Sequence, residues 1–470
     1  MKNELCTSFV EGDLDEELVH IEVVKAGSVL VESSYGRLFM SPTNKLTLHL
    51  HAPSIPGNFP TKDYGEFNGL QVVGTTRSGW KFNTLVFLMK PLSYLPGEDM
   101  AVWSMEPFEV VLQRTTEGEL QSPIRYSGLI DKIDCLFDKS TTRMVEGSTR
   151  PSISLDWSEI KSAEYSIRLY RGDSTWSILE IEMQSNASVE DFNNVLQSFL
   201  NALSLRMGKR VDVLATKITH GRTETSHLAG FHMTRLKHTG NNPIVPLVMR
   251  NNMGSNFLMA AMEFFRENQN SAVINFLYSV WDAELVSREN HRLQLAIALE
   301  GFSKYVNKLQ PGPLCTPAEV KRKADEEKFS KLKDEAVKLI DSIEFDEGHR
   351  NRLKNVVKRA SLNDSGPMIR SAGECLGINF MDDELKCWRS MRHAAAHGDN
   401  STFDETESDF FALQSMLYRL VLRLVGWSGP VVPYGQYAKY VTKPDHEEPV
   451  VQTINLSTIK AIRRVEDNKN

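Results

Sequence analysis

The sequence predicts an α+β protein with a β-rich antiparallel N-terminal domain, sandwich-like or barrel-like, followed by an all-α helical bundle. Short apolar segments separated by Gly, Pro, Asn and Ser turns run as far as about residue 240. Beyond Pro246 the apolar residues recur with the spacing of helices. The 470 residues, 41% hydrophobic and 24% charged, have the makeup of a globular chain, and at roughly 150 residues per domain this length predicts two to three domains.

The N-terminal strands are predicted from short runs whose faces alternate in character. In residues 176–183 Leu179 and Ile181 alternate with Glu180 and Glu182, as expected for a strand with unlike faces. Ser188 is a predicted N-cap for the helix that follows. Residues 19 to about 171 read as short strands separated by turns, and examples of the predicted strands are residues 46–51, 80–89, 108–113 and 164–171, followed by 176–183, 211–219 and 227–234.

A cluster of turn-forming residues at 237–243 marks the predicted boundary between the domains. It predicts a β-rich domain over residues 1–240, a helical domain over 246–430 and a tail over 431–470 with no assigned role. Thr316 followed by Pro317 is a plausible helix start. The predicted helices are residues 257–268, 272–281, 292–306, 316–342, 348–360, 367–376, 382–396 and 405–425.

Charge and cysteine content exclude several classes of protein. The net charge of −7 argues against a chain that coats nucleic acid over its whole surface, although it leaves a local basic cleft open. The five cysteines are scattered without a C-x-x-C pair, which fits a reducing, cytoplasmic location. We expect no signal peptide, no membrane span and no membrane partner. Nucleophile-elbow, P-loop and dinucleotide fingerprints are absent, so common hydrolases, NTPases and dehydrogenases are not supported.

The densest group of reactive side chains lies at residues 389–399, Arg-Ser-Met-Arg-His-Ala-Ala-Ala-His-Gly-Asp. Gly398 is a natural helix stop, so His393 and His397 are predicted in the last turn of a helix, where the dipole favours the imidazolium form. One interpretation is a basic helix end whose histidines satisfy exposed carbonyl groups. A second is a metal site, because the two histidines are four residues apart, but no glutamate base or third ligand accompanies them.

The third interpretation is metal-independent RNA cleavage. That chemistry needs a base, an acid and a fixed cation for the charge that builds on phosphorus, and histidine and arginine supply them. Arg392 and His397 are five residues apart, roughly 140° around a helix, so they do not share one face well. The offset becomes reasonable where two copies of the chain line one groove across a two-fold interface.

Arg392-His-Ala-Ala-Ala-His397 resembles the Arg-x4-6-His motif of HEPN-domain ribonucleases, in which a polar residue, here His393, commonly follows the arginine. The preceding helix at 292–306, the charged helix after it and the closing amphipathic helix resemble the order in ApeA-like HEPN proteins of bacterial antiphage defence. The helical resemblance covers about residues 250–427, and the N-terminal half is similar in layout only. The resemblance implies a homodimeric endoribonuclease that needs no cofactor or metal, leaves a 2′,3′-cyclic phosphate, and acts in abortive infection.

Under this resemblance Arg392 binds the scissile phosphate, His397 is the general acid or base, and His393 contacts phosphate or tunes His397. Arg389 is a supporting candidate. Glu300 lies in an otherwise apolar run, and a buried carboxylate needs a partner. That partner is either an active-site arginine or a local cation, Arg292 or Lys304.

Basic residues just before the motif form a second candidate surface, either an RNA-tracking groove or a solvated helix face. They are Arg350, Arg352, Lys354, Lys358 and Arg359. We expect RNA, with tRNA as one candidate, as the substrate, and a phage-derived trigger that the N-terminal domain senses. Two alternatives stay open: a non-catalytic HEPN module that binds RNA or a partner protein, and a metal-dependent hydrolase that uses His393 and His397.

Overall fold

The structure is a computed structural model of the chain. It describes residues 8–9, 13–25, 27–33, 35–41, 45–53, 70–94, 100–116, 123–133, 139–144, 151–171, 176–229, 253–269, 272–284, 286–309, 316–342, 346–359, 365–397 and 403–427, and in several stretches of these, among them 87–94, 316–326 and 393–397, only the backbone. The predicted tail, residues 431–470, lies outside this part of the chain.

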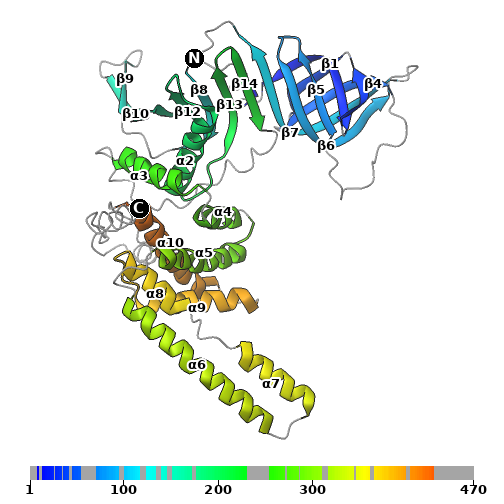
Figure 1. The fold of residues 1–470 in the computed structure, drawn as a ribbon. Coiled ribbons are helices and arrows are strands. Elements are labelled where there is room, and N and C mark those ends of the chain that lie inside the picture. The colour runs from blue at the N-terminus through cyan, green and yellow to red at the C-terminus, as the bar shows by residue number, and fades with distance from the viewer. Residues whose placement is uncertain are drawn as a thin grey trace. The chain divides into compact units, whose positions relative to one another are not determined.

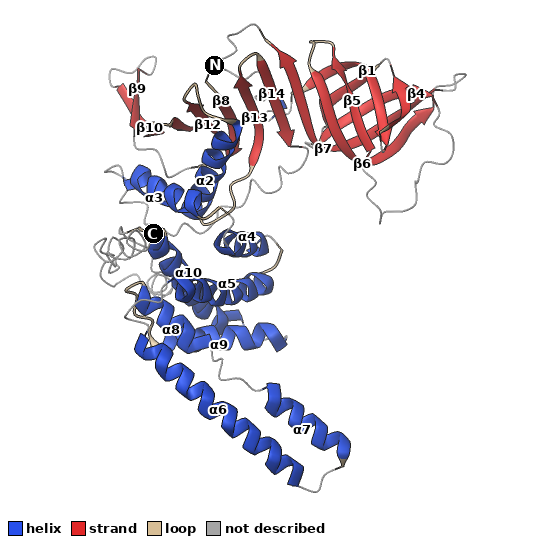
Figure 2. Ribbon diagram, viewed as in Figure 1, coloured by secondary structure: helices blue, strands red, loops and turns tan. Residues whose placement is uncertain are grey.

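The described residues confirm the predicted fold class, with antiparallel strands in the N-terminal half and helices in the C-terminal half (Figures 1 and 2). The strands are β1 (Asp15–Lys25), β2 (Ser28–Ser33), β3 (Gly36–Met40), β4 (Leu46–Pro53), β5 (Leu70–Thr76), β6 (Lys81–Tyr94), β7 (Met100–Thr115), β8 (Arg125–Asp131), β9 (Lys139–Met144), β10 (Pro151–Lys161), β11 (Tyr165–Arg171), β12 (Trp176–Met183), β13 (Val213–His220) and β14 (Thr223–Ala229).

Six of the strands close into a ring, which is the barrel-like arrangement that the sequence left open beside a sandwich. The order β4-β3-β1-β5-β6-β7 is completed by pairing of β4 with β7, for example Leu48 opposite Met105. Both side chains are fully buried, and the ring is filled by apolar residues of this kind. Beyond β7 the sheet continues as an open layer in the order β14-β13-β8-β12-β11-β10-β9.

One face of the open layer is covered by helix α2 (Val189–Met207). The helix begins where the sequence predicts, because the Ser188 hydroxyl accepts a hydrogen bond from Asp191 N–H at 3.0 Å. The Phe192 ring packs 5.6 Å from the ring of Tyr126 on β8, and Val195 and Phe199 are buried on the same stripe.

The last strand of this region differs from its prediction. The sequence predicts a strand over 227–234, whereas β14 begins at Thr223, and residues 230–234 lie outside the described part of the chain. The reason is a tight hairpin: His220 pairs with Thr223, and Gly221 takes a φ of 58°, which glycine adopts without strain. Sequence reasoning missed the turn at Gly221.

The chain divides into two compact units, which are described separately. The first comprises residues 1–207, 211–241 and 246–262, and the second comprises 208–210, 242–245 and 263–470. Residues 246–262, which the sequence assigns to the helical domain, thus group with the first unit. Helix α3 (Met253–Glu267) has residues 253–262 in the first unit and residues 263–267 in the second.

The second unit is helical. Its helices are α4 (Ala272–Glu284), α5 (Arg288–Leu309), α6 (Thr316–Ser342), α7 (Glu347–Arg359), α8 (Ser365–Cys375), α9 (Asp382–His397) and α10 (Phe403–Leu424). Each of them overlaps a helix predicted from the sequence, and α6 begins at the predicted Thr316. Within the described residues, no helix has the length and apolar character needed to cross a bilayer.

Helix α5 is the centre of the second unit because it packs against α4, α8, α9 and α10. Leu295, Leu299 and Phe302 are completely buried along it. By contrast, α6 and α7 pack against each other as a hairpin, and none of their described side chains is buried. The described side chains of the α6–α7 hairpin therefore contribute little to the core.

We predict that Gly373→Ala lowers the free energy of unfolding of the second unit by about 1–3 kcal/mol through overpacking. A Cβ at Gly373 in α8 would lie 2.8 Å from the ring of Phe380, which is buried, and 2.9 Å from the Ile378 carbonyl oxygen. This cost exceeds the gain of about 1 kcal/mol that alanine has over glycine in a helix. Urea unfolding followed by circular dichroism measures it. The exposed substitution Lys386→Ala is the control, and equal stability of the two variants would contradict the prediction.

Candidate functional site

The structure places four of the candidate residues on one helix. Arg389, Arg392, His393 and His397 all lie in α9. His397 is the last residue of the helix and His393 lies one turn before it, as predicted. The side chains of His393 and His397 lie outside the described part of the chain, as does Gly398. The side chains of Arg389 and Arg392 are described, and both are exposed.

Glu300 of α5 contacts Arg392, one of the three cations considered as its partner. The Arg392 Nε atom lies 3.2 Å from Glu300 Oε1. The Glu300 side chain is 11% exposed and that of Arg392 is 49% exposed, so the carboxylate lies at the base of the pair and the guanidinium reaches outward. The Oε1 atom makes no aligned hydrogen bond, so the contact is an ion pair in which charge rather than geometry dominates.

Trp388 holds α9 against α5. Its side chain is almost completely buried, and its indole N–H points to the Ala296 carbonyl oxygen at 3.4 Å, a long contact. Leu385 and Met391 are buried beside it with the three-residue spacing of one helix face. The Arg392 guanidinium lies 5.7 Å from the centre of the Trp388 ring, within the range of a cation–π contact.

The start of α9 is fixed by its own acidic residues. The Glu384 side chain accepts a hydrogen bond from Met381 N–H at 2.9 Å and also pairs with Arg419 of α10. Asp382 pairs with Arg370 of α8. Carboxylates in the first turn are favoured by the helix dipole, so the same residues start the helix and attach it to its neighbours.

The basic residues of the second candidate surface lie on α7 and not on the helices that carry Glu300 and Arg392. Arg350 is half-buried, Arg352 is exposed, and Lys354 pairs with Asp341 of α6. The side chains of Lys358 and Arg359 lie outside the described residues. Since α7 packs against α6, this surface belongs to the α6–α7 hairpin, and one of its cations is already neutralised.

The thiol of Cys387, which lies in α9 two residues before Arg389, has a raised pKa. Burial is the main cause, followed by a hydrogen bond with Asp409 of α10, and together they raise the pKa of the Cys387 thiol from 9.0 to about 12. The thiol therefore stays protonated at neutral pH, and it does not serve as a nucleophile there.

Among the side chains that the structure describes, no group of three or more His, Cys, Asp or Glu residues could hold a metal ion. The His393 and His397 side chains do not belong to that set, so the metal interpretation stays an alternative. Sequence reasoning did not single out Trp388. Its spacing of four residues from Arg392, which places two side chains on one helix face, is the signal that could have found it.

No protein-family model, no curated protein and no solved structure matches this chain. The resemblance of the α9 motif to HEPN ribonucleases therefore rests on the residues of the motif and on the order of the helices around it. The structure adds one observation at this motif, an ion pair between a carboxylate of α5 and an exposed arginine of α9.

We predict a coupling free energy of about 0.5–1 kcal/mol between Glu300 and Arg392, since Arg392 is half-exposed and solvent there weakens the pair. A double-mutant cycle of Glu300→Ala, Arg392→Ala and the double variant, measured by urea unfolding, gives this value. Additive effects of the two substitutions would show that the contact contributes nothing.

We also predict that iodoacetamide alkylates Cys387 at pH 8 at least about a hundredfold more slowly in the folded protein than in urea, because its raised pKa leaves very little thiolate. Peptide mass spectrometry separates Cys387 from the other cysteines. The folded-state rate should keep rising toward pH 12, and a plateau near pH 9 would be inconsistent with the raised pKa.

Proposed function

We propose that the protein is a metal-independent endoribonuclease of the HEPN type that cleaves RNA as a homodimer. The observation that carries this proposal is the Glu300–Arg392 pair, in which a nearly buried carboxylate holds a half-exposed guanidinium one helical turn from the end of α9. Arginine at such a position is a fixed cation for an anionic group, and its motif continues to His397.

The guanidinium chemistry favours a phosphate. Nε of Arg392 faces Glu300, and one side of the group faces the Trp388 ring. One terminal amino group shares the edge of Nε and the other points away from it, and guanidinium donors of this kind match the oxygens of a phosphodiester. A cation held in advance by a neighbour stabilises the charge that develops on phosphorus without having to reorganise during the reaction.

The reaction follows from the residue types. A base removes the proton of the 2′-hydroxyl, the 2′-oxygen attacks phosphorus, and the bond from phosphorus to the 5′-oxygen breaks while an acid protonates that oxygen. The products are a 2′,3′-cyclic phosphate and a 5′-hydroxyl. His397 is the general acid or base, His393 contacts phosphate or tunes His397, and Arg389 supports the site.

A second copy of the chain completes the site. Arg392 and His397 are five residues apart in α9 and so roughly 140° apart around the helix. Two copies related by a two-fold axis bring the arginine of one and the histidine of the other to one groove. The cations of α7 guide the RNA toward it.

The β-rich region senses a phage-derived trigger and restrains the helical unit until then, and RNA cleavage aborts infection in the bacterial cytoplasm. A target with splayed, single-stranded bases, such as a tRNA loop, suits a site that must align a 2′-hydroxyl with phosphorus.

We predict that the purified protein, supplied with phage lysate where a trigger is needed, cleaves RNA in EDTA, and that Arg392→Ala or His397→Ala lowers the rate at least about a hundredfold. Glu300→Gln lowers it less, because Arg392 keeps its charge and loses only its anchor. Cleavage is measured on labelled RNA, with the 2′,3′-cyclic end identified by mass spectrometry.

The matched control is Lys386→Ala, which removes an exposed cation from the same helix and should leave the rate unchanged. Cleavage at the full rate in both Arg392→Ala and His397→Ala would eliminate the mechanism. RNA binding by gel shift with no cleavage would instead support the non-catalytic module, and activity lost in chelator together with bound zinc would support the metal-dependent hydrolase.

A further inference from the structure

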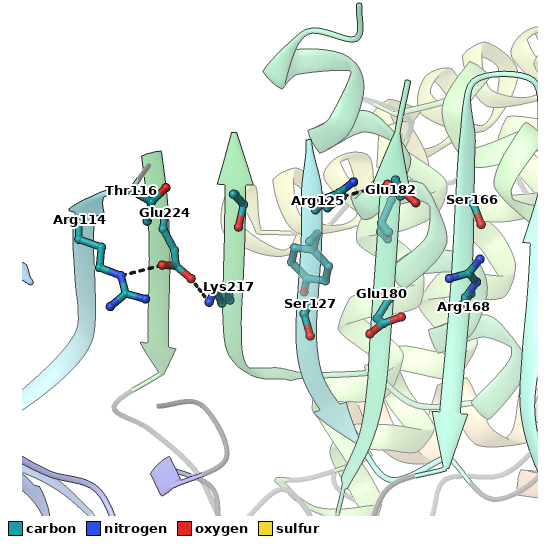
Figure 3. A pocket seen from close by; sticks show the side chains of 13 residues that line it. Arg114, Thr116, Arg125, Ser127, Ser166, Arg168, Glu180, Glu182, Lys217 and Glu224 are labelled. Carbon is teal, nitrogen blue, oxygen red and sulfur yellow. Dashed lines mark hydrogen bonds and ion pairs between the residues drawn. The ribbon is translucent and has the colours of Figure 1, made fainter. Parts of the chain in front are cut away.

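The open layer of the sheet has a charged pocket on the face opposite α2 (Figure 3). The pocket measures about 480 Å³ and runs across β7, β14, β13, β8, β12 and β11. Alternation along the strands separates the two faces: on β11, Ile167 is buried, whereas Ser166 and Arg168 line the pocket. All of these strands belong to the first unit, so the pocket is distinct from the α9 site.

Two carboxylates are held by two cations each at this face. Glu224 of β14, only 5% exposed, contacts Arg114 Nε at 2.7 Å and the Lys217 ammonium group. Glu159 of β10, 9% exposed, contacts Arg168 Nε at 2.9 Å and Lys161 Nζ at 3.2 Å. Each of these two ion-pair clusters thus joins two cations to one carboxylate, and Glu180 of β12 lies opposite Arg168 in the sheet.

Three arginines of the pocket engage their carboxylates in the same way. Arg114 and Arg168 donate through Nε to the two carboxylates above, and Arg125 of β8 donates through Nε to Glu182 at 2.9 Å. Arg37 of the closed ring is different, because it donates to Asp15 through both Nε and a terminal nitrogen. In each pocket guanidinium one terminal amino group shares the edge of Nε and the other points away from the anchoring oxygen; Arg168 also has a hydrogen bond with the Tyr170 side chain.

The pocket as a whole presents hydrogen-bond donors and a net positive charge. Its lining contains four cations, three arginines and Lys217, against the three carboxylates Glu180, Glu182 and Glu224. Hydroxyl groups of serine and threonine lie between the charged side chains, and Figure 3 shows Ser127 beside Lys217 and Ser166 beside Arg168. Hydroxyls add further donors to the guanidinium groups.

We propose that this pocket binds a phosphate-bearing ligand of nucleotide size. Its volume lies within the range of small-molecule sites, about 300–1,000 Å³. Arg125 lies two strands from Arg168, roughly 10 Å, and three strands from Arg114, roughly 15 Å, so that Arg114 and Arg168 are five strands apart. A single carboxylate with two oxygens cannot satisfy donors so widely spaced, whereas a chain of phosphates, or phosphate plus ribose hydroxyls, can. The inference does not depend on the RNA cleavage proposed for the second unit.

The test is isothermal titration calorimetry of the full-length protein in EDTA with inorganic pyrophosphate, adenosine triphosphate and, for comparison, succinate. We expect both phosphate probes to bind and succinate to bind much more weakly. Arg125→Gln and Arg168→Gln should each weaken binding about tenfold or more. Arg37→Gln is the matched control, since it removes an exposed, ion-paired arginine of the same unit outside the pocket, and it should leave the affinity unchanged.

Comparing the two phosphate probes distinguishes recognition of a phosphate group alone from recognition of a whole nucleotide. Equal affinity for the two phosphate probes supports recognition of phosphate alone, and tighter binding of adenosine triphosphate supports recognition of a nucleotide. If a glutamine variant fails to fold by circular dichroism, Arg125→Lys replaces it, because lysine keeps the charge and loses the fork. Absence of binding by both phosphate probes, equal binding of succinate, or unchanged affinity in the pocket variants would overturn the proposal.

Discussion

A nearly buried carboxylate in an apolar helix is the constraint around which the second unit is arranged. Glu300 lies on α5 between Leu299 and Phe302, which are fully buried, and α5 packs against four other helices. Burying an ionised carboxylate without a partner is costly, so a cation must approach it from a neighbouring helix. Arg392 does so, and Trp388, buried one turn earlier, packs the same helix against α5.

The two units use the same device for different surfaces. In each case a carboxylate of low exposure contacts Nε of a more exposed arginine. The pairs are Glu300 with Arg392, Glu224 with Arg114, and Glu159 with Arg168. An arginine fixed in this way loses less rotamer entropy when an anion arrives than one that moves freely in solvent. The proposed RNA site of the helical unit and the proposed ligand pocket of the sheet thus use the same kind of contact, although the two proposals are independent.

Local patterns predicted the fold class and most of the elements, whereas pairing between distant segments could not be predicted. The alternation in residues 176–183 identified β12, and Thr316 with Pro317 identified the start of α6, because both signals are carried by neighbouring residues. Closure of the ring by β4 and β7 joins strands far apart in the sequence, and no local pattern encodes it. The contact between Glu300 and Arg392 was one of several pairings that the sequence allowed, since only packing of α9 on α5 selects it.

The α6–α7 hairpin has a consequence for how the protein opens. Because none of its described side chains is buried, separating the hairpin from the rest of the unit exposes little apolar surface, and its amide protons should exchange with solvent through local opening of low free energy. The amides of α5, by contrast, can exchange only when the core around Leu295 and Leu299 unfolds. We therefore expect the described part of the hairpin, which carries the proposed RNA-guiding cations Arg350, Arg352 and Lys354, to open more readily than α5.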